Sequence, residues 1–381
     1  MTRASRFLKI YSISDGITRE FYNEEIIDVD IIESSNINCS ELPISEASIT
    51  LMPASTIGVI FQRALPMEIY RIYEGDWQLF AKYYITSYSV DNKNRIYKIK
   101  LGDVLSILEN QTYLGGEINT TPTALLDDLL QGFDYTYSGI TTSNIVGYLP
   151  ILNKREALRQ VCEALGVQVV TSRSDKIRLI ERYISSPILI NNSRLYNCQV
   201  AEDNIVTDIE YRYNYLTNSS QGNQTLFSEA LNGTTTLYFS SPTYNYSISG
   251  GTLVESNCNY AVISGTGATV TLTGRQYQKA ERVYTKTNPL AVSSDLKKVM
   301  SINSTLWIES GNVNSLSLIY FIKKKLSIKV NSKLIGSGRI LSMTNGYRLV
   351  DTDIVGDSKP TTISYSLNQP SVVMNAELEM I

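Results

Sequence analysis

Histidine is absent from this chain of 381 residues. It is the side chain that normally changes charge between about pH 5 and pH 8, and it is the commonest protein ligand for metals. Without it, a Ser-His-Asp or Cys-His catalytic pair cannot form, and zinc or non-haem iron sites that use histidine are excluded as well. Chemistry that relies on carboxylates stays open.

Cysteine is scarce. Cys39, Cys162, Cys198 and Cys258 are widely spaced and form neither a CxxC motif nor a close cluster. A zinc knuckle is therefore not expected, and buried free thiols are. Cys162 falls on the apolar face of a predicted helix, where a small hydrophobic side chain is favoured.

Long apolar runs are also missing. No stretch approaches the ~20 consecutive apolar residues of a membrane-spanning helix. Asp15 interrupts the start of the chain before an apolar run of signal-peptide length has formed. We therefore expect no membrane span, and synthesis and folding in the cytoplasm.

Positive charge is not in excess, since the formal net charge is -3 and the isoelectric point is about 5.4. The molecule as a whole has no positive field that would hold DNA by counterion release, so direct nucleic-acid binding is not expected. Hydrophobic residues make up 43% and charged residues 19% of the sequence, as in folded globular proteins. The length suggests roughly two to four domains.

The first part of the chain predicts β structure. Apolar and polar residues alternate over 49–52, 68–73, 82–90 and 96–101. Turn-forming residues separate these runs at Glu74-Gly75-Asp76 and at 91–94. An antiparallel barrel or sandwich follows from this pattern.

Helices are predicted next. Thr121 and Pro122 mark the start of a short helix over 124–130, which Gly132 ends. A longer helix begins at Asn153, whose side chain can cap free amides while Glu156 completes a capping-box-like arrangement. In this helix Leu158, Val161, Cys162 and Leu165 share one face, and Gly166 ends it. Strands over 167–170 and 176–180 complete a small α/β unit.

The remainder predicts mostly strands. Residues 208–278 are rich in Tyr, Asn, Ser, Thr and Gly, which favours many short strands. A helix is predicted over 312–325, ending at Lys323-Lys324-Lys325, and it leads into an alternation in which Leu326, Ile328 and Val330 share a face. Two strands, over 361–367 and 372–380, close the chain.

We therefore expect a mainly β protein with α+β character, in which several β-barrel or sandwich domains surround a small α/β unit. The predicted domains are an N-terminal tube-like β domain (1–110), the α/β domain (111–205), a β domain rich in Tyr, Asn, Ser and Thr (206–300), and a C-terminal domain of helix plus β structure (301–381).

No motif defines an active site or a cofactor site. Gly265-Thr-Gly267 lacks the third glycine of a phosphate loop and is interpreted as a β-turn. Asp351 and Asp353, with Asp357, could collect oxygen ligands for a weakly bound cation, but the glycine and the glutamate of an EF-hand are missing. The sequence therefore predicts no catalytic, cofactor or metal-binding residue.

Carboxylate pairs and tyrosines have simpler interpretations than catalysis. Asp127-Asp128 point to different sectors of a helix and Glu24-Glu25 lie beside a turn, so both are interpreted as solvated surface rather than as a glycosidase pair. The tyrosines of 211–215 and 244–246 suit protein interfaces and core, and stacking on sugars is the alternative.

A series of short blocks resembles, in order, the tail or baseplate hub proteins of phages and phage-derived particles of Gram-positive bacteria. The blocks are Tyr73–Ile85, Tyr97–Asp103, Gly115-Gly116, Gly147–Ile151, Arg155–Val161, Ala164–Gly166 and Thr171–Ile177, within residues 10–183. The C-terminal Ala376–Met380 is similar to the last domain of that family.

The resemblance implies a homotrimer at the end of a tail tube, in which two β domains per chain match the sixfold tube to a threefold spike. The implied partners are the tail tube or distal tail protein, the central spike or tip protein, and other baseplate proteins. The implied location is the tail of a virion or phage-like particle assembled in the bacterial host cytoplasm. The leading hypothesis is a non-enzymatic structural hub needed for tail assembly. The alternatives are a receptor- or glycan-binding adhesin and a hub with cell-wall hydrolase activity.

Overall fold

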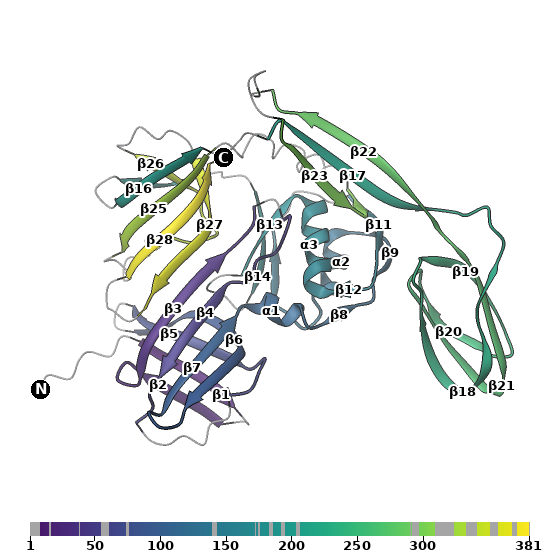
Figure 1. Cartoon of the computed structure of the whole chain (residues 1–381), viewed down its shortest axis with the longest axis horizontal. Coiled ribbons are helices and arrows are strands. Elements are labelled where there is room, and N and C mark those ends of the chain that lie inside the picture. The colour runs from purple at the N-terminus through teal and green to yellow at the C-terminus, as the bar shows by residue number, and fades with distance from the viewer. Residues whose placement is uncertain are drawn as a thin grey trace, which may run out of the picture.

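The computed structural model describes residues 8–14, 17–37, 39–54, 61–73, 76–138, 143–171, 173, 176–182, 186–191, 195–202, 206–289, 291, 297–308, 324–332, 341–350, 357–367 and 372–380. In these residues the protein is mainly β, with three helices and several separate sheets. The predicted fold class is confirmed. Figure 1 shows a large sheet on one side, the helices in the middle, and a β module at the far end of a two-stranded arm.

The largest sheet combines strands from both ends of the chain. The N-terminal strands are β1 (Leu8–Ser14), β2 (Ile17–Tyr22), β3 (Ile26–Ser34), β4 (Glu46–Leu51), β5 (Pro66–Tyr73), β6 (Asp76–Asp91) and β7 (Ile96–Gly102). The later strands are β15 (Ile188–Asn191), β16 (Leu195–Glu202), β25 (Lys324–Ser332), β26 (Tyr347–Val350), β27 (Asp357–Ser366) and β28 (Val372–Met380).

The order across this sheet is β16-β25-β28-β27-β3-β4-β7-β6-β5-β1-β2, with β26 and β15 branching from β27. The two ends of the chain meet where β27 pairs antiparallel with β3, from Thr362 opposite Ser34 to Ser366 opposite Asp30. One apolar core spans the junction, because it contains Val29 and Ile31 of β3 as well as Ile363 and Met374 of the C-terminal strands.

The predicted N-terminal strands are present, and the turn at 91–94 forms through the Asp91 carboxylate, which accepts bonds from the amides of Lys93 and Asn94. Residues 312–323 of the predicted helix 312–325 lie outside the described residues. Lys324 and Lys325 are the first residues of strand β25 and do not end a helix. Their backbones pair with Glu202 and Ala201 of β16.

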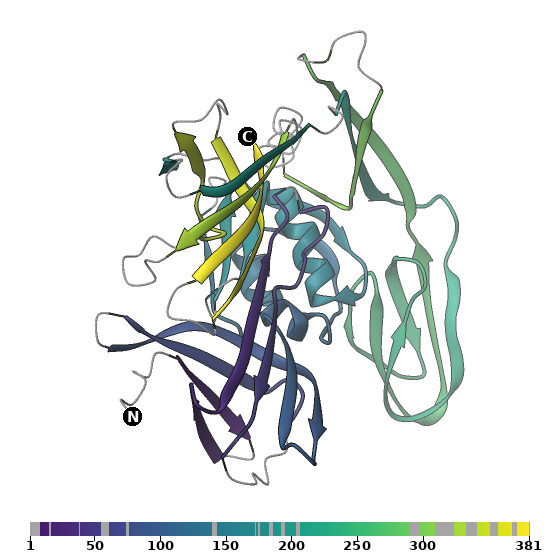
Figure 2. The same ribbon diagram turned by 60° about the vertical axis from the view of Figure 1, so that its left-hand side comes forward.

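The α/β unit lies between the large sheet and the distal β module, as two views show (Figures 1 and 2). Its elements are α1 (Val104–Leu108), β8 (Thr112–Tyr113), β9 (Gly116–Thr120), α2 (Pro122–Leu129), β10 (Tyr135–Tyr137), β11 (Ile145–Leu149), β12 (Leu152–Asn153), α3 (Lys154–Leu165), β13 (Val167–Val170), β14 (Ile177–Glu181) and β24 (Leu306–Trp307).

Helix α3 is built as its sequence predicts. The Asn153 side chain accepts a 2.8 Å bond from the Glu156 amide, and Gly166 ends the helix with a φ of 68°. The Glu156 carboxylate does not close a capping box, because it accepts bonds from the Arg159 guanidinium instead. Leu158, Val161 and Cys162 are fully buried in the second apolar core.

The third region forms an arm and a distal module. The arm base is a sheet of β17 (Asp208–Thr217), β22 (Gln278–Thr287) and β23 (Val299–Ser304). The distal module, residues 218–277, is a sheet of β18 (Gln224–Tyr238), β19 (Thr243–Ser249), β20 (Thr252–Ser256) and β21 (Tyr260–Gln276). The expectation of many short strands was wrong, since β18 has 15 residues and β21 has 17.

The β-turn predicted at Gly265-Thr-Gly267 is also wrong, because both glycines lie within strand β21. Gly265 pairs with Gly233 beside a bulge between Ala230 and Asn232. A β-carbon on Gly265 would lie 2.5 Å from the Leu231 carbonyl oxygen, so glycine here allows two strands to approach closely.

Replacing Leu158 with Asp is expected to destabilise the protein by about 3 kcal/mol or more, because the change removes buried apolar area and buries a charge. Ala124→Asp, at an exposed position in the first turn of α2, is the matched control and is expected to leave stability unchanged. Urea unfolding measures both variants. Equal midpoints for Leu158→Asp and wild type would refute the assigned packing of α3.

Candidate functional site

The carboxylates considered from the sequence do not form a catalytic pair. Asp127 and Asp128 are exposed on α2, and each accepts a 2.7 Å bond from a different tyrosine, Tyr135 and Tyr113. The Glu25 carboxylate accepts a bond from the Ala54 amide. These contacts fix local turns and the packing of α2, and none places two carboxylates across a cleft.

Asp351 and Asp353 lie outside the described residues. Asp357 forms a bidentate ion pair with Arg348, at 2.6 and 3.0 Å. In the part of the chain that the structure describes, no group of three or more acidic or cysteine side chains could hold a metal ion. In the same part, no helix is long and apolar enough to cross a membrane.

All four cysteines are free thiols, as expected. Cys39, Cys162 and Cys258 are buried, and Cys198 is partly buried. Burial raises the pKa of the Cys162 thiol well above its ordinary value. A thiol held in its neutral form is a poor nucleophile, so these residues act as packing groups.

The tyrosines of β17 build the core of the arm base. Tyr211 is fully buried and Tyr213 packs beside it against Trp307. Trp307 also stacks on Tyr284 of β22, with ring centroids 4.8 Å apart. The core interpretation holds for these residues, which leaves little of their ring surface for a sugar.

A buried ion pair ties the large sheet to the α/β unit. Arg173 donates from Nε to Oε1 of Glu33 at 2.6 Å, and its Nη2 donates to the Leu341 carbonyl oxygen at 2.5 Å. The Tyr365 hydroxyl donates to the same Glu33 oxygen at 2.6 Å, and the guanidinium lies against the ring of Phe80. Glu33 is fully buried.

This cluster, which we call the Arg173 junction, was not predicted from the sequence. Glu33 occupies an inward position in the alternation of β3, and a charged residue at such a position is the one signal that could have revealed it.

Asp103 forms a second buried polar contact. Its carboxylate accepts bonds from the Ser45 amide, the Leu105 amide at the start of α1, and the Thr171 hydroxyl. Burial raises the pKa of Asp103 to about 6, although these hydrogen bonds oppose the rise. The contact joins the β3–β4 connection, α1 and the end of β13.

Glu163 lies at the seam between α3 and the arm base. It is 1% exposed, and the Tyr211 hydroxyl donates to its Oε2 at 3.3 Å. Burial raises the pKa of Glu163 to about 7, while Arg182, Ser304 and Arg159 act in the opposite direction.

The distal module docks on the α/β unit through two asparagines of the β20–β21 loop. Asn259 donates to the carbonyl oxygens of Leu114 at 2.8 Å and Leu149 at 2.7 Å, and Asn257 donates to the Gly115 carbonyl oxygen at 3.0 Å. A β-carbon on Gly115 would lie 2.1 Å from the Leu149 carbonyl oxygen, so glycine is required where the segment before β9 approaches the end of β11 within the α/β unit. Two blocks of the family resemblance, Gly115-Gly116 and Gly147–Ile151, therefore build the docking site.

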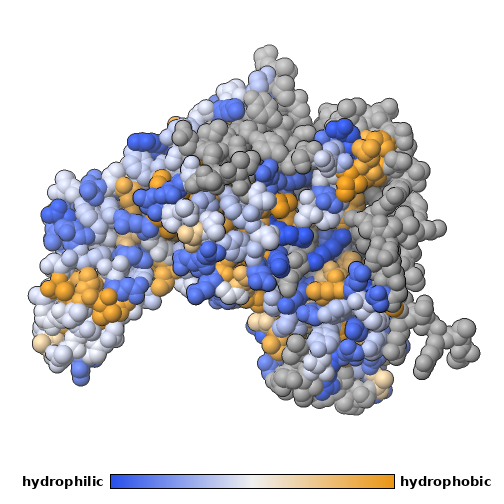
Figure 3. Space-filling model, turned by 180° about the vertical axis from the view of Figure 1, so that it is seen from behind, coloured by the Kyte–Doolittle hydropathy of each residue, from blue (hydrophilic) through white to orange (hydrophobic). Residues whose placement is uncertain are grey.

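The distal module itself is thinly packed. Four of its residues are fully buried in the described core, Ala261, Ile263, Val270 and Leu272, and eight further hydrophobic side chains are only partly buried around them. Figure 3 shows apolar side chains gathered on the surface of this module, which forms a separate lobe in the view from behind.

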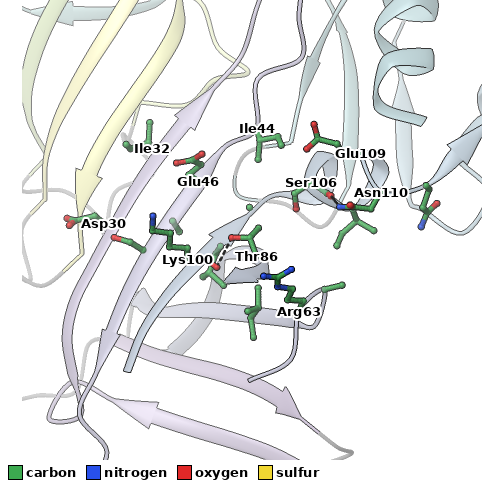
Figure 4. Close-up of a pocket in the computed structure, with 18 residues that line it drawn as sticks. Asp30, Ile32, Ile44, Glu46, Arg63, Thr86, Lys100, Ser106, Glu109 and Asn110 are labelled. Carbon is green, nitrogen blue, oxygen red and sulfur yellow. Dashed lines mark hydrogen bonds between the residues drawn. The ribbon is translucent and has the colours of Figure 1, made fainter. Parts of the chain in front are cut away.

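An open groove of about 850 Å³ lies on the outer face of the large sheet beside α1 (Figure 4). Asp30, Glu46 and Lys100 reach it from strands β3, β4 and β7, whereas Glu109 and Asn110 follow α1. Ile32, Ile44 and Ile107 supply apolar side chains, and Thr86 lies beside Lys100 in the middle of the view with Arg63 below it.

Burial and the nearby Asp28 raise the pKa of Asp30. The groove is lined by no histidine or cysteine, and one of its carboxylates, Glu109, forms an ion pair with Arg155. We call it the sheet groove, and its composition suits binding rather than catalysis.

This fold, a continuous β scaffold with an inserted α/β unit and a projecting β module, is similar to the folds of three solved tail proteins. The chain aligns with the tail protein from Neisseria meningitidis MC58 over 99% of its own length and 97% of that chain, with a TM-score of 0.59 and 9% identity. It also aligns with the prophage MuSo2 43 kDa tail protein from Shewanella oneidensis, over 97% of its own length and 98% of that chain. The TM-score is 0.57 and the sequence identity is 8%.

Prophage tail protein gp18 from Listeria monocytogenes EGD-e is also similar, over 97% of this chain and 94% of that one, with a TM-score of 0.53 and 10% identity. The sequence matches no family model and no curated protein. The expected likeness to phage tail proteins is confirmed at the level of the fold, and its restriction to Gram-positive bacteria is not confirmed.

Replacing Arg173 with Met is expected to lower the free energy of unfolding by about 3 kcal/mol or more, since it leaves the Glu33 carboxylate buried without its cation. Arg348→Met removes a bidentate pair of the same geometry at the surface, and we expect no measurable change there. Chemical unfolding of both variants measures the difference. Equal losses for the two variants would show that burial does not set the strength of the Arg173 junction.

Glu163 is expected to make stability fall as the pH rises toward 7. Its folded pKa of about 7 lies above the ordinary value of 4.5, so the folded chain keeps a proton that the unfolded chain releases. The resulting stabilisation, on the order of 3 kcal/mol, is complete below the unfolded pKa and is lost as the pH passes the folded one.

Glu163→Gln should therefore remove the decline in stability that spans about pH 4.5 to pH 7. Asp103 contributes a decline of the same sign that ends near its folded pKa of about 6. Lys359, whose pKa burial lowers from 10.5 to about 8, adds stability only as the pH rises above 8. Unfolding midpoints across this window test the effect, and an unchanged slope in Glu163→Gln would contradict it.

Proposed function

We propose that the chain is the structural hub of a phage or phage-like tail, a ring of three copies that joins the tail tube to the central spike or tip protein. The observation that carries the proposal is the full-length likeness to three tail proteins, which covers 97% or more of this chain in each case. The ordered sequence blocks support the more specific hub position.

A hub must transmit load between neighbours without changing shape. The continuous sheet through β27 and β3 supports this role, because it makes the two ends of the chain one body. Buried charge contacts at the Arg173 junction and at Asp103 support it further, since broken buried pairs are costly. The tail tube or distal tail protein, the spike or tip protein and other baseplate proteins are the proposed partners, within the tail of the particle.

We also propose that the hub is not an enzyme. The absence of histidine and the separate partners of Asp127 and Asp128 support this view. Peptidoglycan release by the purified chain that disappears with a single carboxylate-to-amide change would instead establish a hub with hydrolase activity. Specific binding on a glycan array would favour the adhesin.

In the intact particle, three copies of this chain are expected at the distal end of the tail tube. The reason is that head-to-tail contacts that close by rotation give a ring of defined copy number, and the family resemblance selects three. Imaging of particles labelled on this chain, with averaging around the tail axis, measures the number. One copy or six copies, or label along the tube, would refute the hub assignment.

A further inference from the structure

The distal module is attached to the rest of the chain at two places (Figure 1). One is the arm, in which Thr217 at the end of β17 pairs with Gln278 at the start of β22. The other is the contact of the β20–β21 loop with the α/β unit. Residues 218–223 and Tyr277 lie between the arm strands and the distal sheet, so the chain can bend there.

The two attachments differ in chemistry. The arm base is fixed by apolar packing, since Tyr211 and Ile302 are buried in one cluster and Trp307 of the α/β unit packs against it. Among the described residues, the apolar cluster of the distal module includes none from the α/β unit. Side-chain amides and the Tyr277 hydroxyl, which donates to the Glu117 carboxylate, hold the module instead.

A cysteine lies inside this second contact. Cys258 is 2% exposed, and burial, followed by the nearby Glu117 carboxylate, raises the pKa of its thiol to about 12. Burial and the same thiol raise the pKa of Tyr148 on β11. Glu117 and Tyr148 belong to the α/β unit, whereas Cys258 belongs to the module. The docked arrangement therefore helps to cover the thiol, and separation of the two parts would uncover it.

We propose that the distal module is a hinged lobe, held closed by Asn257, Asn259 and Tyr277 and able to swing about the end of the arm. We call these three residues the latch. When the latch opens, its donors and acceptors bind water, so the net cost of each lost bond is small. Opening the arm base would expose apolar area to water, so the arm base stays in place. The proposal concerns this chain alone and does not depend on the hub function.

The open lobe presents surfaces that the closed form covers. The carbonyl oxygens of Leu114 and Leu149 lose their donor on one side, and the Asn259 amide loses its acceptors on the other. A neighbouring protein that binds either surface holds the lobe open, because a ligand shifts an equilibrium toward the state that it binds. The latch thus lets contact with a neighbour change the reach of the lobe.

Alkylation of Cys258 measures the opening. Asn259→Ala removes two latch bonds, and we expect it to raise the rate at which N-ethylmaleimide alkylates Cys258 on the order of tenfold, the factor for one or two net hydrogen bonds. Peptide mass spectrometry gives the rate at each cysteine. Cys162, which is fully buried in the core around α3, should react no faster than in the wild type.

Two further variants complete this experiment. Tyr277→Phe removes only a hydroxyl and keeps the ring that stacks on Tyr244, so it leaves the fold intact and should give a smaller rise at Cys258. Asn223→Ala is the matched control, because it removes a side-chain bond from Arg275 within the module and leaves the latch in place. No rise is expected for the control.

A distance measurement distinguishes a swinging lobe from a loosened loop. Ala124 on α2 and Thr252 on β20 are exposed, so Ala124→Cys and Thr252→Cys can carry spin labels. Cys198→Ser is included, since Cys198 is only partly buried and would also be labelled. With the latch intact, the labels should show one dominant distance. Adding Asn259→Ala should produce a second, broader population.

Three results overturn the proposal. They are equal alkylation of Cys258 in the wild type and both latch variants, a rise at Cys162 that matches the rise at Cys258, and a single unchanged distance between the labels. A rise in Asn223→Ala equal to that in Asn259→Ala would assign the effect to loosening within the module and would reject the latch as well.

Discussion

The Arg173 guanidinium holds three distant parts of the chain at one point. It binds Glu33 on β3 and the Leu341 carbonyl oxygen, and Tyr365 on β27 binds the same carboxylate. A buried ion that loses its partner is heavily penalised, so these parts are stable together only in one arrangement. The contact bridges β3 and β27 where these strands pair, so it reinforces the continuity of the large sheet.

Buried polar contacts also join the other parts of the molecule. Four apolar clusters form the cores, one of which reaches from the large sheet to Val170 of β13, and polar contacts also lie where the parts meet. Lys359 of β27, which is 2% exposed, donates to the Gln168 side chain at 3.0 Å and to the Glu181 carbonyl oxygen at 2.7 Å. Asn259 likewise joins the distal module to the α/β unit through its bonds to the Leu114 and Leu149 carbonyl oxygens.

Apolar contact is non-directional, whereas a buried hydrogen bond is satisfied in few geometries. The apolar cores therefore fold the parts, and the polar seams set how the parts are oriented. For a protein proposed to align one symmetrical assembly with another, orientation is the property that matters most.

Local features of this fold could be predicted from the sequence, and non-local ones could not. Helix α3 was predicted to the residue at both ends, because its cap, its apolar face and Gly166 lie within one short segment. Strands β4 to β7 were found because alternation is also a local signal, whereas β1, β2 and β3 were not predicted individually. Alternation shows that a strand has a buried face but does not identify its neighbour, so the pairing of β27 with β3 remained invisible.

The errors also have a physical origin. Gly265 was interpreted as a turn residue, since glycine suits both a turn and a close approach of two strands, and the sequence does not distinguish the two. The strands of the distal module were expected to be short because residues 208–278 are rich in Tyr, Asn, Ser, Thr and Gly. Asn232 and Gly233 in fact lie beside a bulge, where a strand continues with one extra residue. The buried role of Arg173 was not predicted, since its partners Glu33 and Leu341 lie far away in the sequence.

The way the distal module is attached allows it to change in evolution independently of the scaffold. β17 and β22 pair along their whole length, so the chain leaves at Thr217 and returns directly opposite, at Gln278. A domain whose ends are adjacent can be inserted at such a point without shifting the register of any scaffold strand. The scaffold can thus keep its form while the lobe at the end of the arm is exchanged, lengthened or lost.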